Sequence, residues 1–258
     1  MSRGRAVAVL ALIGAIGVAG SGCSAGTGPE AAPPVPERST ITVGAASSLT
    51  DVLATVAEEF TAANPGVSVR LSFAASSAIA EQIRGGAPLD VFASAGTTAM
   101  APMLAEGLVT GATAFAGTSL QIAVPPGNPA GVTGLEDLAR GTVVVCQRQV
   151  PCGVATAQLF ERNAIAVTPA SYEPDVRSVL GKVAADEADA GIVYATDVLA
   201  SESRVVGIPI PPEANVTTTY EAAVVADSTN ASAAAAFVAF LSGPEAQATL
   251  SAAGFVLP

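Results

Sequence analysis

The chain alternates short β-like runs with segments of helical period from residue 40 to its end. Strands are predicted at residues 40–45, 67–73, 90–94, 118–125, 142–146, 190–194, 204–210 and 217–226, and helices at 49–60, 77–84, 97–105, 154–163, 176–186, 231–241 and 244–253. Parallel strands need crossover connections, so repeated strand–helix units predict an α/β fold with mostly parallel sheets and helices on their faces.

Two series of strand–helix units are joined by long apolar strands at 118–125 and 217–226. This arrangement predicts two lobes, each a mostly parallel sheet flanked by helices, with a ligand cleft between them. We expect the first lobe to comprise residues 40–118 plus 220–258 and the second to comprise 119–219. In open α/β sheets, ligands bind beyond the carboxyl ends of strands, where helices begin.

The N-terminus has the features of an export signal. Arg3 and Arg5 precede an apolar run at 6–19 that is shorter than the roughly 20 residues of a membrane span. Small residues then lead to Cys23, as in a bacterial lipoprotein signal, although Gly20 stands where that pattern usually has an aliphatic residue. We expect a signal over residues 1–22, lipidation of Cys23 and a flexible tether over 23–39 rich in Pro, Gly and Ala. A retained membrane anchor and an ordinary secreted protein are the alternatives.

The charge and the remaining cysteines limit the function further. Without Arg3 and Arg5 the chain has 9 basic and 22 acidic residues, a net of −13, and no basic cluster, which argues against nucleic-acid binding. Cys146 and Cys152 form a leftover pair, most simply a disulfide in an exported protein. A metal site lacks partners, because the chain has no histidine and the spacing is not C-x2-C.

Paired serines stand at two strand-to-helix junctions, Ser47-Ser48 and Ser76-Ser77. A helix N-terminus offers unpaired N–H groups and a partial positive charge, so several facing one cleft can hold an anion without lysine or arginine. Helix capping is the alternative: Ser48 with Asp51 matches an S-x-x-D capping box, and Ser77 can cap its own helix.

Tyr194 ends the apolar strand at 190–194, where its hydroxyl needs a partner, with core packing alone as the alternative.

Five segments then carry a resemblance in their order and spacing: "AASSLTDVL", "SFAASSAIAEQIRGGAPLDVFASA", "VPCGVA", "PDVRSVL" and "AGIVYATDV". Together they resemble the ModA family, the molybdate-binding proteins of molybdenum ABC importers. The resemblance spans residues 41–258.

The resemblance implies a two-lobed periplasmic-binding-protein fold that holds molybdate or tungstate by neutral groups. By residue-to-residue correspondence, Ser48, Ser76 and Tyr194 would donate hydroxyls, and Cys152 and Val176 would donate backbone N–H groups, with Ser77 left to cap its helix. Cys152 departs from the alanine of many relatives, which a backbone donor tolerates. No cofactor, no direct metal ligand and no catalytic residue are implied. The expected partners are the oxyanion, an ABC permease and the membrane surface, for a monomer outside the cytoplasm.

Three other functions are alternatives to this one. A carrier of sulfate or another tetrahedral oxyanion would use the same fold. An exported serine hydrolase is disfavoured, because a chain without histidine has no Ser-His-Asp triad and no G-x-S-x-G motif occurs within residues 40–258. The single lysine, Lys182, falls in a predicted helix that we expect to be exposed, which weakens a Ser-Lys pair. A purely structural surface protein would need no cleft.

Overall fold

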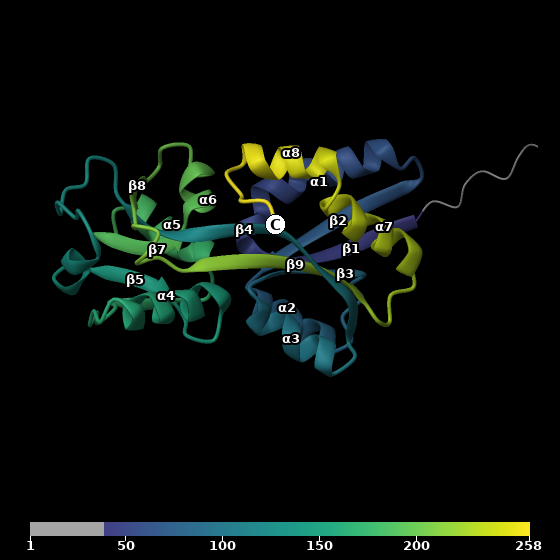
Figure 1. The fold of residues 1–258 in the computed structure, drawn as a ribbon, viewed down its shortest axis with the longest axis horizontal. Helices are drawn as coiled ribbons and strands as arrows, with labels where there is room; N and C mark the ends of the chain where they lie inside the picture. Colours follow the sequence, from purple (N-terminus) through teal and green to yellow (C-terminus); the bar gives the residue numbers. More distant parts are fainter. Residues whose placement is uncertain (1–38) are drawn as a thin grey trace, which may run out of the picture. The chain divides into compact units, whose positions relative to one another are not determined.

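The computed structural model describes residues 39–258 (Figure 1). The predicted signal, the tether as far as residue 38 and the lipidation site Cys23 lie outside the described residues. The strands are β1 Ser39–Ala46, β2 Val67–Ala74, β3 Val91–Ala95, β4 Val109–Val124, β5 Val143–Cys146, β6 Ser171–Glu173, β7 Ala190–Tyr194, β8 Val206–Pro209 and β9 Thr217–Val225. The helices are α1 Thr50–Ala63, α2 Ser76–Arg84, α3 Thr97–Ala105, α4 Pro151–Arg162, α5 Val176–Ala184, α6 Ala195–Leu199, α7 Ala231–Leu241 and α8 Pro244–Ala252, with 3-10 turns η1 Ser47–Leu49 and η2 Leu135–Ala139.

The strands join in one sheet path, β2-β1-β3-β9-β4-β7-β5-β6, with β8 paired to β4. The predicted parallel pairings are present: β1 pairs with β2 and β3, and β5 pairs with β6 and β7. Strands β4 and β9 pair antiparallel with each other, and each is also antiparallel to its other neighbours, β7 and β8 for β4 and β3 for β9. The α/β class predicted from the sequence is therefore confirmed, with a mixed sheet.

Strand β4 is much longer than the predicted 118–125, since it begins at Val109. The added segment is rich in Ala and Gly, which are depleted in strands, and it has two register irregularities against β9, so its sequence gives only a weak strand signal. Its first part pairs with β9 and its last part with β7 and β8. Strands β4 and β9 thus connect the two halves of the sheet, as Figure 1 shows.

The buried apolar side chains separate into clusters on the two sides of this connection. One cluster takes its members from residues 120–216, with Ala75 as the exception. The other two take theirs from residues 41–116 and 220–255. On this basis we propose lobe 1 as residues 40–118 plus 220–258 and lobe 2 as 119–219. No helix within residues 39–258 is both long and apolar enough to span a membrane.

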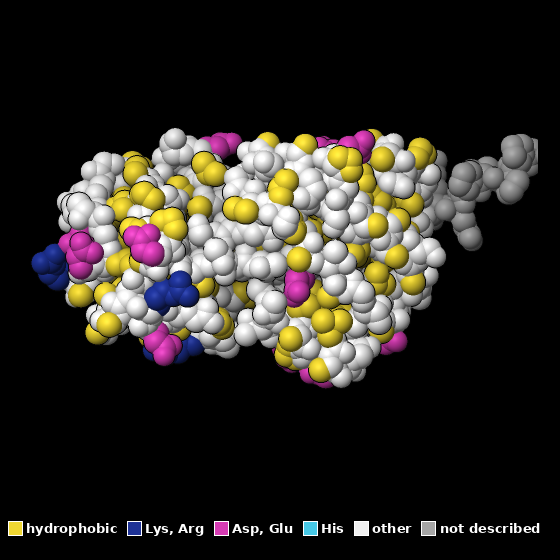
Figure 2. Space-filling model, viewed as in Figure 1, with side chains coloured by type: hydrophobic (Ala, Val, Ile, Leu, Met, Phe, Trp, Pro, Cys, Tyr) yellow, Lys and Arg dark blue, Asp and Glu magenta, His cyan; other side chains and the backbone are white. Residues whose placement is uncertain are grey.

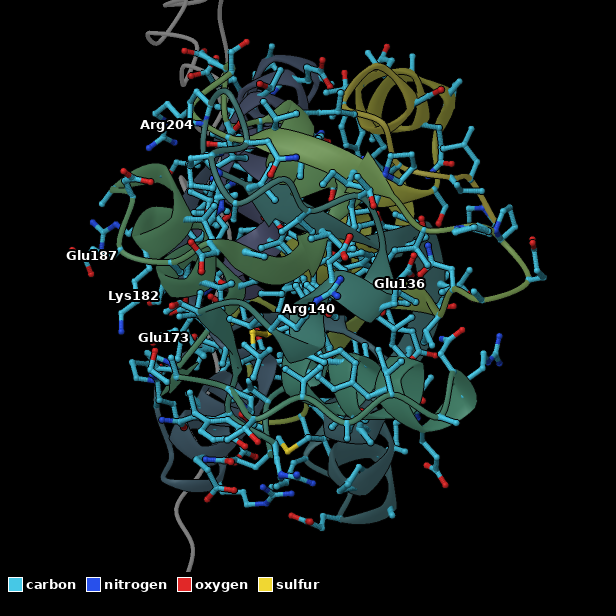
Figure 3. All side chains as sticks on the ribbon, turned by 90° about the vertical axis from the view of Figure 1, so that its left-hand side faces the viewer. Glu136, Arg140, Glu173, Lys182, Glu187 and Arg204 are labelled. Atoms are coloured by element: carbon cyan, nitrogen blue, oxygen red, sulfur yellow. A yellow bond between two sulfur atoms is a disulfide. The ribbon has the colours of Figure 1, made fainter. Side chains whose placement is uncertain are left out.

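Charged groups on the face shown in Figure 2 are sparse, and its Lys and Arg side chains lie over lobe 2. Lys182 is half-buried rather than exposed. Its Nζ atom lies 2.7 Å from Glu173 Oε1 and donates to Ser171 Oγ at 3.1 Å (Figure 3). Burial would raise the pKa of Glu173, but the Lys182 and Ser171 contacts bring it below its ordinary value. Lys182 is therefore part of a local ion pair within lobe 2.

Candidate functional site

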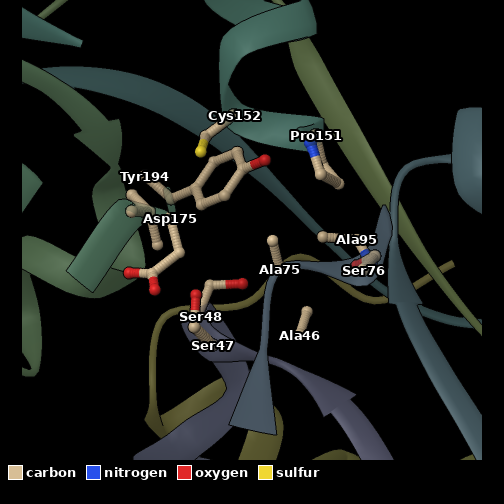
Figure 4. A pocket seen from close by; sticks show the side chains of 11 residues that line it. Ala46, Ser47, Ser48, Ala75, Ser76, Ala95, Pro151, Cys152, Asp175 and Tyr194 are labelled. Carbon is tan, nitrogen blue, oxygen red and sulfur yellow. The ribbon is translucent and has the colours of Figure 1, made fainter. Parts of the chain in front are cut away.

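A small pocket of about 210 Å³, including the space open to solvent, lies between the lobes (Figure 4). All five predicted ligand residues line it, and each is at most 6% exposed. The lining consists of Ala46, Ser47, Ser48, Ala75, Ser76, Ala95, Pro151, Cys152, Asp175, Val176 and Tyr194. The fold thus brings together predicted ligand residues as far apart in the sequence as Ser48 and Tyr194.

The N-terminus of α2 supplies backbone donors from lobe 1. Ala75 O accepts from Ala78 N at 2.9 Å and from Ile79 N at 3.0 Å. The amides of Ser76 and Ser77 come before this first hydrogen-bonded turn, so the helix itself does not use them. They add the partial positive charge of a helix N-terminus to the pocket wall.

The N-terminus of α4 supplies a donor from lobe 2. Pro151 is the first helical residue and has no N–H. Val150 O accepts from Gly153 N at 2.9 Å and Val154 N at 3.0 Å. The Cys152 amide is therefore the first N–H of this helix, and it remains available to a ligand.

The N-terminus of α5 is built in the same way. Asp175 is its N-cap, and its Oδ1 atom accepts from Ser178 N at 2.9 Å. Asp175 O accepts from Val179 N at 3.3 Å, so the Val176 amide precedes the first turn. Asp175 is also the one charged side chain among the described residues that line the pocket. Its carboxylate caps the N-terminus of α5 through the hydrogen bond from Ser178 N.

Two serine hydroxyls are oriented as donors by their neighbours. Ser48 Oγ accepts from the Tyr220 hydroxyl at 2.9 Å, and Ser76 Oγ accepts from Ala95 N at 2.9 Å. Each contact occupies an acceptor position on the serine oxygen, so the serine proton must point away from that donor. A ligand that only accepts hydrogen bonds suits both hydroxyls.

The Tyr194 hydroxyl is buried in the wall of the pocket. Thr218 lies close enough to affect its pKa, but no protein atom of the described part forms a hydrogen bond of acceptable geometry with this oxygen. Burial raises the pKa of Tyr194 far above its ordinary value. The side chain therefore stays protonated and neutral at physiological pH, as a hydrogen-bond donor requires.

The predicted serine caps are wrong in both junctions. The N-cap of α1 is Leu49 and that of α2 is Ala75, and neither makes a side-chain cap. The η1 turn moves the start of α1 past Ser48, and Asp51 pairs with Arg177 instead of closing a capping box. Because α2 begins at Ser76, Ser77 is already its second residue and cannot occupy the cap position.

The loop before α4 is held by a disulfide and a glycine. The predicted bond between Cys146 and Cys152 is confirmed. A Cβ atom on Gly153 would lie 1.9 Å from the backbone oxygen of Gln147, a distance that no side chain tolerates. The disulfide and this close approach together fix the position of the Cys152 amide in the pocket wall.

Sequence reasoning missed the groups that orient the donors. Tyr220 lies in the apolar run of β9, where it looks like an ordinary core residue. Its role depends on the register that sets it opposite Ala95, next to the pocket. Asp197 is also buried, in a short helix that was not predicted, and its Oδ2 atom accepts from Tyr194 N at 3.2 Å.

The site therefore combines neutral donors from both lobes and has no lysine or arginine in its described lining. Such a pocket suits a fully deprotonated anion, because a protonated ligand would need an acceptor. Each hydrogen bond to a charged group contributes roughly 1.5–3 kcal/mol. Several together can offset the desolvation of a dianion.

Comparison with known proteins agrees with this chemistry. The family model described as bacterial extracellular solute-binding protein matches residues 41–256. The molybdate-binding protein ModA of Mycobacterium tuberculosis H37Rv is 37% identical over 252 residues, covering 96% of this chain and 97% of the relative.

Two solved structures share the fold. The periplasmic molybdate-binding protein of Azotobacter vinelandii has a TM-score of 0.73 at 22% identity, over 84% of this chain and 99% of that one. The sulfate-binding protein SubI of M. tuberculosis H37Rv has a TM-score of 0.76 at 21% identity, over 85% and 87%. Solute-binding proteins carry ligands rather than convert them, so the prediction of no enzymatic activity is confirmed. The chain belongs to the ModA family of bacterial extracellular solute-binding proteins.

Proposed function

We propose that this protein captures molybdate, and also tungstate, outside the cytoplasm and delivers it to an ABC importer. The observation that carries the proposal is the convergence of Ser48, Ser76, Cys152, Val176 and Tyr194 on one buried pocket. Membership of the ModA family, with a relative named as molybdate-binding at 37% identity, supports the choice of ligand.

In the proposed complex, the hydroxyls of Ser48, Ser76 and Tyr194 and the amides of Cys152 and Val176 donate to the four oxygens of the anion. The donors come from both lobes, so binding holds the lobes together around the ligand. No cofactor takes part. The oxygens of the anion, not its metal atom, contact the protein.

Delivery of the anion to the importer requires the protein to lie at the outer side of the membrane. We propose that the signal over residues 1–22 exports the chain and that lipidation of Cys23 anchors it through the tether at the outer side of the membrane. There the loaded monomer would meet the permease of its ABC transporter. Mass analysis of the protein from cells would show a diacylglycerol adduct on Cys23, and an unmodified N-terminus would contradict the anchor.

Sulfate is the second candidate, favoured by the fold shared with SubI. The donor set alone accepts any fully deprotonated tetrahedral anion. Size is the discriminating property, because donors set for longer metal–oxygen bonds leave the smaller sulfate poorly paired.

Thermal unfolding with molybdate, tungstate, sulfate and phosphate in turn tests the proposal. A ligand at about 1,000 times its dissociation constant adds about 4 kcal/mol, and each kcal/mol raises the midpoint by roughly 2–4 °C in a chain of this size. We expect a rise of roughly 8–16 °C with molybdate and tungstate. A rise with sulfate alone would transfer the assignment to a sulfate carrier, and no rise with any anion would refute oxyanion binding.

A further inference from the structure

We propose that Arg177 is a latch that holds lobe 2 against lobe 1 and slows release of the ligand. The identity of that ligand rests on the proposed function, but the latch itself does not. Arg177 is the second residue of α5, directly after the predicted ligand Val176. It does not line the pocket, so it acts on the position of the lobes and not through contact with the anion.

Its contacts cross the cleft. Arg177 Nε donates to Ser47 O at 3.3 Å, and the guanidinium pairs with the Asp51 carboxylate. Within residues 39–258, these are the side-chain hydrogen bonds that join the two lobes away from the β4–β9 connection. These two contacts form the latch, on the side of the cleft where α5 meets η1 and α1.

The same side chain is fixed on its own lobe. Arg177 Nε lies 3.4 Å from Oδ1 of Asp197, whose side chain is completely buried. The other Asp197 oxygen accepts from the backbone N–H of Tyr194. The contacts of Arg177 therefore extend from the backbone of one predicted ligand residue, Tyr194, to the turn that carries another, Ser48.

This geometry predicts an effect on rates. The latch can form only when the lobes are closed, so it favours the closed state with or without ligand. A ligand enclosed by donors from both lobes leaves only after the lobes separate. Loss of the latch should therefore raise the dissociation rate of the ligand.

Three variants separate the latch from simple structural damage. Asp51→Asn removes the partner across the cleft and touches neither Tyr194 nor Asp197. Arg177→Gln removes both contacts of the latch. It also leaves the buried Asp197 carboxyl without its cationic partner, so its folding must be checked separately. Asp51→Glu restores the carboxylate and should restore wild-type behaviour.

Arg84→Gln is the matched control. Arg84 also contacts two carboxylates, Glu81 and Glu106, and its side chain is 31% exposed against 24% for Arg177. Its contacts lie within lobe 1. The same substitution there should leave ligand release unchanged.

Stopped-flow tyrosine fluorescence with molybdate gives both rate constants. The chain has no tryptophan and three tyrosines, of which Tyr194 lines the pocket and Tyr220 contacts Ser48. An exposed ion pair contributes up to about 1 kcal/mol, so Asp51→Asn should raise the dissociation rate about two- to fivefold. Arg177→Gln should raise it about tenfold or more, because a charged hydrogen bond is lost as well.

Small-angle X-ray scattering of the ligand-free proteins tests the latch without any ligand. We expect a larger radius of gyration for Asp51→Asn and Arg177→Gln than for the wild type, Asp51→Glu and Arg84→Gln. Equal radii, together with equal dissociation rates, would overturn the latch. A wild type that shows no response to molybdate would instead count against the proposed ligand, while the scattering comparison would still decide the latch.

Discussion

Replacing Tyr194 with phenylalanine should weaken ligand binding without weakening the fold. The change removes one oxygen from a side chain that is 1% exposed and keeps the ring. That oxygen has no hydrogen-bonding protein partner in the described part of the chain. The free protein therefore loses no internal hydrogen bond, whereas the complex loses a donor to the anion.

The two effects have opposite signs. A buried hydroxyl without a partner costs about 1–3 kcal/mol, so its removal should leave the free energy of unfolding unchanged or raise it by up to that amount. A hydrogen bond to a charged group contributes about 1.5–3 kcal/mol. Its loss should weaken molybdate binding roughly 10- to 150-fold, since 1.4 kcal/mol corresponds to a factor of ten.

Isothermal titration calorimetry with molybdate and urea unfolding without ligand measure the two quantities. Tyr172→Phe is the control, because Tyr172 is 45% exposed and does not line the pocket. Equal affinity in Tyr194→Phe and wild type would refute the assigned donor. A large loss of stability in the free variant would show that the hydroxyl has a structural role instead.

Three further predictions concern the walls of the pocket. Gly153→Ala should lower the melting temperature and the molybdate affinity together, because the new Cβ would lie 1.9 Å from Gln147 O; wild-type values for both would contradict this close approach. Reduction of the Cys146–Cys152 disulfide should weaken molybdate binding by loosening the loop, and calorimetry with and without reductant should show it, whereas unchanged affinity would refute the link. Burial raises the pKa of Asp197 to about 7 from 3.8, against the opposing effect of Arg177. The protonated carboxyl therefore stabilises the folded state most at pH values below its unfolded pKa. This contribution to the free energy of unfolding is lost as the pH rises towards 7, by up to about 1.4 kcal/mol per pH unit. In denaturant titrations, the free energy of unfolding should fall less between pH 5 and pH 7 for Asp197→Asn than for the wild type. Identical slopes of this free energy against pH would contradict the assignment of the raised pKa to Asp197.

Much of the fold could be predicted from local patterns. Helices α3 and α7 and strand β7 have the predicted bounds, because caps, glycines and apolar spacing mark them clearly. The first part of β4 and the short β6 and α6 were missed. These elements are weakly patterned or only a few residues long, and long-range pairing rather than local preference forms them.

The candidate site was predicted through resemblance more than through local chemistry. Paired serines at helix starts indicated an anion site but did not distinguish ligand from cap; neither the alternative cap at Ser48 nor the predicted cap at Ser77 is present. The Tyr220 contact with Ser48 depends on tertiary register, and the Arg177 contact with Asp51 depends on how the lobes meet. No local sequence pattern carries either kind of information.

Calorimetric titration of molybdate into the wild type and into Ser48→Ala/Ser76→Ala tests directly whether the serine hydroxyls hold the anion. We expect one tight molybdate site in the wild type. Loss of two charged hydrogen bonds, about 3–6 kcal/mol together, should weaken binding by roughly 10²- to 10⁴-fold in the double variant. Cooperative urea unfolding is the control that its fold survives the loss of the Tyr220 and Ala95 contacts. Absence of binding in the wild type, or equal affinity in both proteins, would show that this pocket does not hold molybdate through Ser48 and Ser76.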